Sequence, residues 1–549
     1  MTAASATRRL RGWGLVLFAA ALAAQSCIPR SWAQVSAHPA GELIYRAGIL
    51  PSAQPLSGVR EPNLPILGAE AACMNCHRRS GFGDVEGHIK IPAVTGKYLF
   101  SPRGYESEQR RLPVVDAAHS SRDAYTNETL ARAIREGVGP DGHKLNYLMP
   151  HYALNEADMA ALIEYLKSMT PVRSPGVERA ALHFATIVTS DADPTQRRGL
   201  LDVLERFFAD RSEAAFAGTP YGQVSHGKIS ANRRWQLHVW DLTGPPEGWD
   251  EQLHAWLLRE PVLAVISGLG GRTWAPIHRF CEQAELPCLF PDVDLPVVAE
   301  HDFYSVYFSR GVLLEAGLIA RGLTDGKTAP GVGRVVQIFR SGDIGEPAAN
   351  ALSAAVTGFQ VLNRPLKAGN VERDLAAALR DVNRRDALVL WLRPKDLEAL
   401  ARLPAAKSRV FVSGLMGGLD SAPLPPAWRA VTTMAYPMDL PDKRVIRVDF
   451  PLGWFRIKRI PVVDERVQTD AWLACNFLSE TLDHMGETVS RDYLIDSLEG
   501  RLDHVLLTGY YPRLSLGPNQ RFASKGGYLV RFAEPEGKRL VAISDWIAP

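Results

Sequence analysis

Two hydrophobic patterns follow one another along the chain. Up to residue 169, apolar residues recur at helical spacing within 126–136 and 156–169, which predicts amphipathic helices, and 41–47 is expected to form an earlier one. Gly137 stands where the helix at 126–136 should end. The prolines within 171–175 then break the pattern and predict a linker between domains.

From residue 182 the pattern changes to short apolar runs that alternate with helical stretches. Strands are expected at 182–188, 235–242, 262–266, 287–290, 334–339, 387–392, 409–413 and 430–436, and helices at 194–208, 249–258, 274–284, 346–362, 371–383, 395–403 and 471–485. Such alternation predicts βαβ units with parallel sheets. Because it restarts after Gly322, we expect two lobes, each a doubly wound sheet.

Composition adds only broad limits to this picture. The 549 residues give room for about three average domains. Charged residues make up 22% and hydrophobic residues 46%, which is an ordinary globular mixture. The net charge of +2 and the lack of a long basic run give no argument for nucleic-acid binding.

The first 33 residues have the layout of a secretory signal peptide. Arginines at 8, 9 and 11 precede a short apolar run at 13–24, and a small-x-small cleavage site follows at 31–33. The run is too short for a helix across a bilayer core of ~30 Å, and no later stretch is long enough either. Two weaker interpretations stay open: a lipoprotein anchor at Cys27 and an incomplete twin-arginine motif. We therefore expect export to the periplasm without a transmembrane segment in the mature chain.

A five-residue motif then carries the clearest chemistry. Cys73, Cys76 and His77 form a C-x-x-C-H run, the attachment signature of c-type haem. The two thiols add to the haem vinyl groups, and the histidine becomes the proximal iron ligand. Export supports this interpretation, because a free C-x-x-C outside the cytoplasm tends to oxidise.

The residues around this motif resemble the class I cytochrome c family over about 41–169. Pro92, within 91–96, matches the family's proline loop, and Met149, after the glycine-rich 137–142, matches its loop methionine. The resemblance implies an all-α domain with one covalently attached haem c. It also implies His77 and Met149 as axial ligands and the Pro92 carbonyl as partner of the His77 ring. A thioether opposite an imidazole raises the reduction potential, which suits an electron carrier.

Some alternatives remain open near this motif. His143, His151 and Met159 are other candidates for the sixth ligand, although Met159 lies within a helical pattern typical of core. Arg78 and Arg79 follow the motif directly. They are expected either to face haem propionates or a docking partner, or to belong to a solvated loop.

Three further cysteines lie beyond the motif. Cys281 and Cys288 are seven positions apart at a helix-to-strand turn, and in an oxidising compartment they are candidates for a disulfide. Geometry decides whether the bond forms. Cys475 lies in a helical run and is expected to be a small buried hydrophobe.

The second part of the chain resembles the type 1 periplasmic binding proteins, in particular the branched-chain amino-acid receptor group. The resemblance covers nearly all of 182–549. It rests on the βα alternation, on 304–308 leading into a helix, on the late helix 471–485, and on 516–524 before a closing strand pair. It implies a cleft between the lobes, where ligands bind, and hinge segments that let the lobes close.

Candidate ligand contacts lie in two loops. Ser267, Gly271 and Thr273 belong to a glycine-rich loop that opens a helix, so its N–H groups are suited to an anion, or its glycines simply make a tight turn. The next loop carries Asp292 and Asp294. Two acids there would repel a carboxylate, so we expect an alcohol, an amine, a metal-bound species or no ligand instead of an amino acid.

Together these features predict a multidomain protein, with a signal peptide at 1–33, a cytochrome domain at 34–172, a linker at 173–181 and a bilobed binding domain at 182–549. Known hydrolase, metalloprotease and P-loop motifs are missing, so we expect no enzymatic activity. The expected function is one-electron transfer with a periplasmic redox partner such as a dehydrogenase, while the binding module takes a small ligand or docks that partner. The alternative is a ligand receptor whose haem reports redox state.

Overall fold

The computed structural model describes residues 39–86, 89–102, 122–169, 174–216, 233–326, 328–367, 369–485, 488–518 and 520–549. The expected signal peptide, with Cys27, lies outside these residues. The described chain divides into two compact units, one from Met1–Cys73 and Asn127–Ser168, the other from Met74–Thr126 and Met169–Pro549. Within the described ranges, no helix has both the length and the apolar character needed to cross a bilayer.

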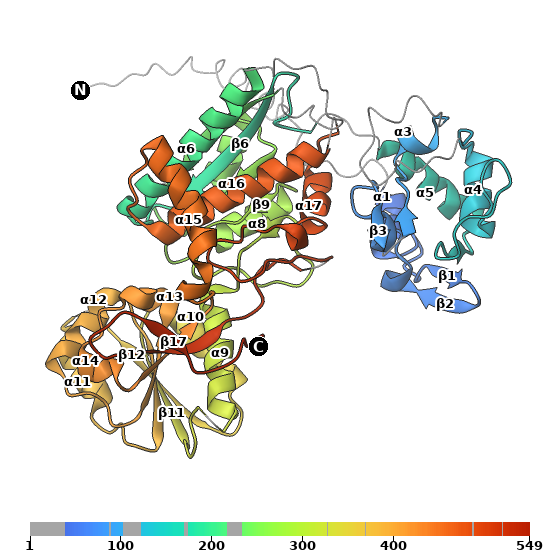
Figure 1. Cartoon of the computed structure of the whole chain (residues 1–549). Helices are drawn as coiled ribbons and strands as arrows, with labels where there is room; N and C mark the ends of the chain where they lie inside the picture. Colours follow the sequence, from blue (N-terminus) through green and yellow to red (C-terminus); the bar gives the residue numbers. More distant parts are fainter. Residues whose placement is uncertain are drawn as a thin grey trace, which may run out of the picture. The chain divides into compact units, whose positions relative to one another are not determined.

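The first unit contains the helices expected from the periodic pattern (Figure 1). They are α1 (Pro39–Glu42), which continues as a π-helical turn at Leu43–Ala47, α4 (Asn127–Glu136) and α5 (Glu156–Ser168). α1 packs so closely on α5 that a Cβ at Gly41 would clash with the backbone of Ala161, so only glycine fits there. The rings of Tyr45 and Tyr165 seal this contact, with centroids 5.5 Å apart.

Short strands also occur in the region expected to be all-α. In the first unit they form a sheet in the order β2-β1-β5, from β1 (Ser57–Arg60), β2 (Leu64–Leu67) and β5 (His151–Tyr152). In the second unit, β3 (Asp84–Glu86) pairs with β4 (Ile89–Ile91) in an antiparallel hairpin. The all-α expectation is therefore met only in part, because strands of two to four residues carry too little periodicity to be detected in a sequence.

The first lobe of the second unit is built on a parallel sheet with the order β10-β9-β8-β6-β7. Its strands are β6 (Ala181–Val188), β7 (Arg234–Asp241), β8 (Ala264–Ile266), β9 (Cys288–Leu289) and β10 (Ser305–Val306). Its helices are α6 (Pro194–Phe216), α7 (Trp249–Arg259), α8 (Ala275–Gln283), α15 (Pro441–Lys458), α16 (Glu465–Met485) and α17 (Arg491–Glu499). The central strand β8 is buried throughout, as expected for a parallel sheet covered on both faces.

The second lobe contains a sheet with the order β12-β11-β13-β14-β15-β16-β17. The first five strands are parallel: β11 (Arg334–Arg340), β12 (Gln360–Leu366), β13 (Asp386–Trp391), β14 (Arg409–Ser413) and β15 (Thr432–Tyr436). β16 (Tyr528–Phe532) and β17 (Leu540–Ala542) close the sheet in antiparallel pairing. Its helices are α9 (Gly311–Thr324), α10 (Gly345–Ala355), α11 (Val371–Leu379), α12 (Pro394–Leu397), α13 (Gly414–Gly417) and α14 (Pro426–Arg429).

One predicted helix was partly wrong in this lobe. The helix expected at 346–362 ends at Ala355, and its last residues belong to strand β12. β12 lies at the edge of the sheet and contains Pro365, which a central strand could not accommodate because proline lacks the N–H needed for pairing. Several positions of β12 are exposed and polar, so the strand has no clear hydrophobic pattern from which it could be predicted.

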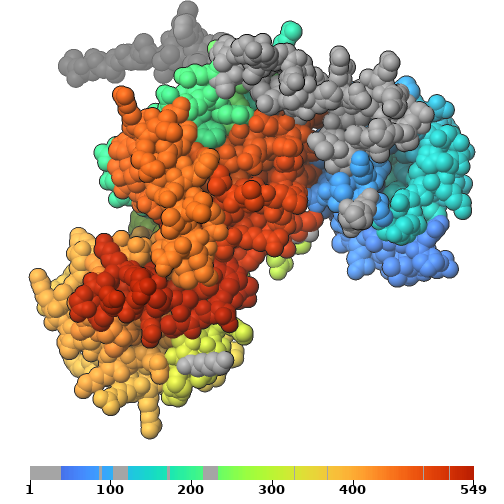
Figure 2. All heavy atoms as spheres, viewed as in Figure 1, coloured from blue at the N-terminus to red at the C-terminus, as the bar shows by residue number. Residues whose placement is uncertain are grey.

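The chain passes between the two lobes at 309–311, at 437–440 and at 524–527. Figure 2 shows the last part of the chain, orange-red to red, over both lobes on the face in view. This part pairs with the first lobe through Tyr307, whose N–H donates to the Arg521 carbonyl at 2.8 Å, before it enters β16. Residues that follow β9, β14 and β15 line one cavity near these crossings. The carboxyl ends of both sheets therefore come together there, which is where open α/β sheets bind ligands.

Candidate functional site

The haem-attachment motif ends in a buried, oriented histidine. Cys73 directly precedes α2 (Met74–His77), and His77 is the last residue of this helical turn, with 7% of its surface exposed. Its Nδ1 lies 2.9 Å from the carbonyl oxygen of Pro92, which is the contact expected from the family resemblance. Because a carbonyl can only accept, Nδ1 carries the proton and Nε2 keeps its lone pair for a metal.

The neighbouring loop holds the Pro92 carbonyl in place. The β3–β4 hairpin pairs Asp84 with Ile91, so the chain returns to His77 directly before Pro92. Gly83 has φ +78°, its N–H donates to the His77 carbonyl at 3.1 Å, and any Cβ there would clash with the Ile91 carbonyl. A glycine is therefore required for this close approach.

Burial also favours the ligating form of His77. It lowers the pKa of His77, and the Pro92 contact opposes this effect only in part. A c-type haem needs two cysteine thiols at C-x-x-C spacing and a neutral imidazole, and the chain supplies all three groups at one helical turn. Cys73, Cys76 and His77 thus fit this cofactor.

The described surroundings distinguish the candidates for the sixth ligand. Met159 is 1% exposed within α5, so it belongs to the core of the first unit. His143 is exposed and bonds through Nδ1 to the carboxylate of Asp141. His151 lies in β5 with its ring against Gly137. Met149, half-buried in a turn, remains the candidate that matches the family position.

The loop after the motif is not the solvated segment that was one interpretation of Arg78 and Arg79. Arg78 is 6% exposed and donates to the carboxylate of Glu499 in α17. Arg79 lies 3.1 Å from a Glu285 carboxylate oxygen and stacks over the ring of Phe303 at 4.7 Å. Both arginines, which belong to the second unit themselves, therefore contact its distant residues.

Two further contacts tie this loop to α17. The N–H of Ser80 donates to Asp496 Oδ2 at 2.9 Å, and the ring of Phe82 packs on Tyr493 with centroids 4.5 Å apart. Burial raises the pKa of Asp496 to about 7, although Arg78 acts in the opposite direction. The sequence offered no sign of these partners, because α17 was not among the predicted helices.

A cavity lies at the carboxyl ends of both sheets. Its walls come from the loops after β9 and β10, from the ends of β14 and β15, and from α16: the lining residues are Pro291, Asp292, Val293, Asp294, Tyr307, Phe308, Ser309, Gly311, Leu415, Met438, Arg466, Asp470 and Tyr511. Its volume is about 20 Å³, which is room for about one water-sized group. Of the candidate ligand contacts, Asp292 and Asp294 line it, whereas Ser267, Gly271 and Thr273 do not.

The glycine-rich loop serves the fold instead. The N–H of Arg272 donates to Asp191 Oδ2 at 3.0 Å, and the N–H of Gly271 donates to the Thr189 hydroxyl at 3.0 Å. Although burial acts to raise it, the Arg272 and Thr189 contacts hold the pKa of Asp191 below its usual value. The anion expected at this helix start is thus the chain's own carboxylate.

The other two residues of this loop also have local roles. Thr273 accepts from the N–H of Ala275 at 3.3 Å and so begins α8. Ser267 is buried with φ +53°, and its N–H donates to the Leu289 carbonyl at 2.8 Å. Neither side chain lines the cavity.

Arg466 and Asp470, which sequence analysis missed, form the charged centre of the cavity. Arg466 Nη1 lies 2.9 Å from Asp292 Oδ1 and Nη2 lies 3.4 Å from Asp294 Oδ1. Tyr511 donates to Asp470 Oδ2 at 3.3 Å. The available signal was a pair of opposite charges spaced four positions apart at the start of α16, which begins at Glu465, whereas the helix was predicted only from residue 471.

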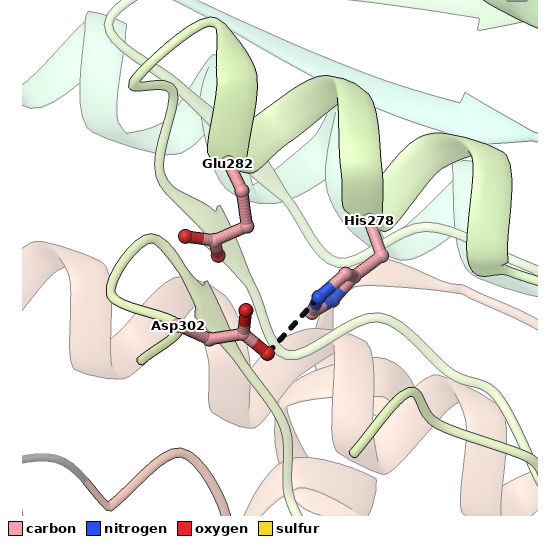
Figure 3. Close-up of side chains that lie close together, drawn as sticks. All are labelled: His278, Glu282 and Asp302. Carbon is pink, nitrogen blue, oxygen red and sulfur yellow. Dashed lines mark ion pairs between the residues drawn. The ribbon is translucent and has the colours of Figure 1, made fainter. Parts of the chain in front are cut away.

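A separate polar cluster, formed by His278, Glu282 and Asp302, supports the fold nearby (Figure 3). His278 Nε2 lies 3.0 Å from Asp302 Oδ2 and Nδ1 lies 2.7 Å from the Tyr307 hydroxyl. The Glu282 carboxylate accepts N–H bonds from 303–305, between 2.7 and 3.2 Å long. Because both ring nitrogens and this carboxylate already have partners in the chain, the cluster anchors the entrance to β10.

The disulfide proposed for Cys281 and Cys288 is not formed in the structure. Both side chains are buried thiols, and they hydrogen-bond to each other. Burial raises the pKa of Cys281 well above its usual value, which disfavours the thiolate that oxidation needs. Cys475 is fully buried in α16, as expected for a core residue.

Comparison with known proteins adds a family for the first part of the chain. Residues 67–170 match the family model described as cytochrome c, so this stretch is a cytochrome c domain. It contains the attachment motif, Pro92 and Met149. Comparison with curated protein sequences gives no match.

Solved structures similar to the chain are solute-binding proteins. A fatty acid ABC transporter substrate-binding protein from Thermomonospora curvata is 15% identical, with 69% of this chain and 95% of that chain covered and a TM-score of 0.47. A possible leucine/isoleucine/valine-binding protein from Rhodopirellula baltica SH 1 is 16% identical, with coverages of 68% and 98% and a TM-score of 0.47. LivJ from Streptococcus pneumoniae, in complex with isoleucine, is 11% identical, with coverages of 67% and 100% and a TM-score of 0.47.

Proposed function

We propose that the protein is an exported, periplasmic c-type cytochrome that transfers single electrons, and that its bilobed module binds a small ligand. The observation that carries the first part is the orientation of His77 at the end of the C-x-x-C-H motif. His77 is buried, and its Nδ1–H donates to a backbone carbonyl, so its Nε2 lone pair is available to bind iron.

Each residue then has a defined task. Cys73 and Cys76 would anchor haem through thioether bonds, which keep the group attached outside the cytoplasm. His77 and Met149 would provide the axial donors. When bound, haem supplies a reversible one-electron change between ferric and ferrous iron. We therefore propose a carrier and not an enzyme.

The proposal is tested by export of the full chain from a bacterium that has the haem-attachment machinery. We expect haem that stays with the protein after denaturation, a pyridine haemochrome spectrum typical of two thioether bonds, and a redox titration with one electron. The Cys73→Ser and Cys76→Ser double variant should lose the covalent haem. Purification of the unaltered chain with no haem would contradict the proposal.

A second candidate is a ligand receptor whose haem state is read by a partner protein. It is favoured by the buried contacts that join Arg78 and Ser80 to α17, since these link the haem motif directly to a helix of the binding module. If ligand binding shifts the haem potential, the receptor is supported. If saturating ligand leaves the potential unchanged, the module acts as a scaffold for the carrier, for example by docking a periplasmic dehydrogenase.

A further inference from the structure

The cavity between the lobes holds more acidic than basic charge. Asp292, Asp294 and Asp470 all face the single guanidinium of Arg466, at 2.9, 3.4 and 3.8 Å respectively. Charges that leave water need partners, because an unpaired buried ion is strongly destabilising. The single positive charge of one guanidinium cannot balance the negative charges of three ionised carboxylates.

Two carboxylate oxygens mark where the missing partner belongs. Asp292 Oδ2 and Asp470 Oδ1 are buried and have no hydrogen-bond donor within the described part of the chain. The two side chains are 4% and 3% exposed, and both residues line the cavity. Since buried carboxylate oxygens are normally hydrogen-bonded, a donor with positive charge is the group this cavity lacks.

The arrangement suits an ammonium group better than a metal ion. Among the described residues, the only cluster whose ligand atoms converge tightly enough for one ion is that of His278, and it excludes these aspartates. The Arg466 guanidinium also lies between Asp292 and Asp294. A primary ammonium has three N–H donors that can reach separate carboxylates and a tyrosine hydroxyl.

The remaining walls indicate the rest of the ligand. Pro291, Phe308, Leu415 and Met438 present apolar surface, and the rings of Phe308 and Tyr511 stack with centroids 5.2 Å apart. A volume of about 20 Å³ accepts a head group of the size of water and little more. A short alkyl chain would therefore fit only when the lobes part slightly at the segments that connect them.

We propose that this cavity binds a small primary amine in its ammonium form, held by the carboxylates of Asp292 and Asp470. The inference rests on the proposed ligand-binding function of the module and names its ligand class. Arg466 holds the aspartates through their other oxygens. Among the described residues that line the cavity, Arg466 is the only cation and is already paired, so the cavity offers little attraction for a carboxylate ligand.

Protonation behaviour supports this assignment. Burial raises the pKa of Asp292 to about 6, and Asp464 adds to this shift. Burial also raises the pKa of Asp470 well above its usual value, and Asp292 and Asp464 add to that shift. Arg466 opposes both shifts, and Tyr511 also lowers the pKa of Asp470, while Asp294 raises that of Asp292. Binding of a cation favours the ionised carboxylates, so the affinity for amines should rise as the pH rises through about 6, the pKa of Asp292.

The test uses the haem-loaded full chain and isothermal titration calorimetry at pH 8. The probes are methylamine and ethylamine, and the matched neutral and anionic controls are methanol, ethanol and acetate. Glycine, a zwitterion with the same ammonium group, is the control for the effect of an added carboxylate. We expect saturable binding of the amines and no binding of the controls. In a second titration at pH 6, near the pKa of Asp292, the binding heat should depend on the ionisation enthalpy of the buffer. No amine binding, or alcohols binding as tightly as amines, would overturn the inference.

Two variants place the ligand on the proposed residues. Asp470→Asn and Asp292→Asn each remove one acceptor charge and should weaken amine binding about tenfold or more, as expected from the loss of a charge-assisted hydrogen bond. Asp449→Asn, on the exposed face of α15, should leave the affinity unchanged. Unweakened binding to both cavity variants would place the amine elsewhere and overturn the assignment.

The result of the amine-binding test can be distinguished from the result of the test of electron transfer. The redox titration of the same preparation reports the cytochrome, whatever the calorimetry shows. If one of the variants does not fold, judged by its far-UV circular dichroism, the comparison of amines with alcohols and acids on the unaltered chain still decides the ligand class.

Discussion

The guanidinium of Arg78 and the carboxylate of Glu499 form a buried ion pair, although the two residues are 421 positions apart in the chain. Their side chains are 7% and 3% exposed. Arg78 directly follows the proximal histidine candidate, and Glu499 ends α17. Glu499 also accepts from Arg521, which leads into the strand that closes the second lobe, so one carboxylate joins three distant segments.

Removal of Glu499 should therefore destabilise the chain. Glu499→Ala removes one carboxylate partner from each of two buried guanidinium groups, and we expect a loss of about 3 kcal/mol in the free energy of unfolding. Urea unfolding followed by tryptophan fluorescence measures it. The control is Glu372→Ala, which breaks an exposed pair with Arg402 and should destabilise the chain far less, because solvent screens exposed pairs. Equal losses in the two variants would mean that the buried pair contributes no more to the free energy of unfolding than the exposed pair does.

Gly83 should matter for haem ligation and not only for the loop. Gly83→Ala places a Cβ against the Ile91 carbonyl and displaces the Pro92 carbonyl from His77. A weaker bond at Nδ1 makes the imidazole a poorer donor, so the haem potential should rise. Gly142→Ala is the matched control, because this glycine also has positive φ, at +85°, but open space around it. It should cost about 1 kcal/mol of stability and leave the potential unchanged.

Met149 and Met159 should respond in opposite ways to truncation. Met149→Ala should remove the sulfur-to-iron charge-transfer band at the red end of the oxidised spectrum and lower the potential, because the thioether favours ferrous iron. Met159→Ala should keep the band but destabilise the first unit by about 2 to 5 kcal/mol, since it empties a buried site. A band that survives in Met149→Ala and vanishes in Met159→Ala would reverse the assignment.

The buried Glu315 should make stability depend on pH. It accepts from the Ser413 hydroxyl and from the N–H of Leu415 at 2.8 Å, and burial raises its pKa from 4.5 to about 8. Between these two values the folded chain holds a proton that the unfolded chain has released. This group's contribution to stability is therefore complete below about pH 4.5 and is lost as the pH rises to about 8, at up to about 1.4 kcal/mol per pH unit.

Glu315→Gln copies the protonated form and removes this dependence. We expect the variant to equal the unaltered chain near pH 4.5 and to melt at a higher temperature at pH 9. Thermal unfolding of both chains across this range, followed by circular dichroism, measures the difference. A constant difference in melting temperature at all pH values would show that Glu315 does not titrate in this window.

Sequence alone determined the features that depend on neighbouring residues. The haem motif could be recognised because its two thiols and its imidazole lie within five positions, on one helical turn. β13 and β14 could be predicted because central parallel strands are buried on both faces and leave continuous apolar runs. Helix α15 was missed because Pro451 and several exposed apolar residues disturb its pattern.

Only the tertiary structure decided which distant residues meet. Asp292 and Arg466 are 174 positions apart, and nothing local to either one predicts that α16 returns to the carboxyl end of the first sheet. The same holds for Arg78, whose burial depends on a helix near the other end of the chain. The free energy of a charge depends on its solvation and on its partners, and both are set by how the chain packs rather than by its order.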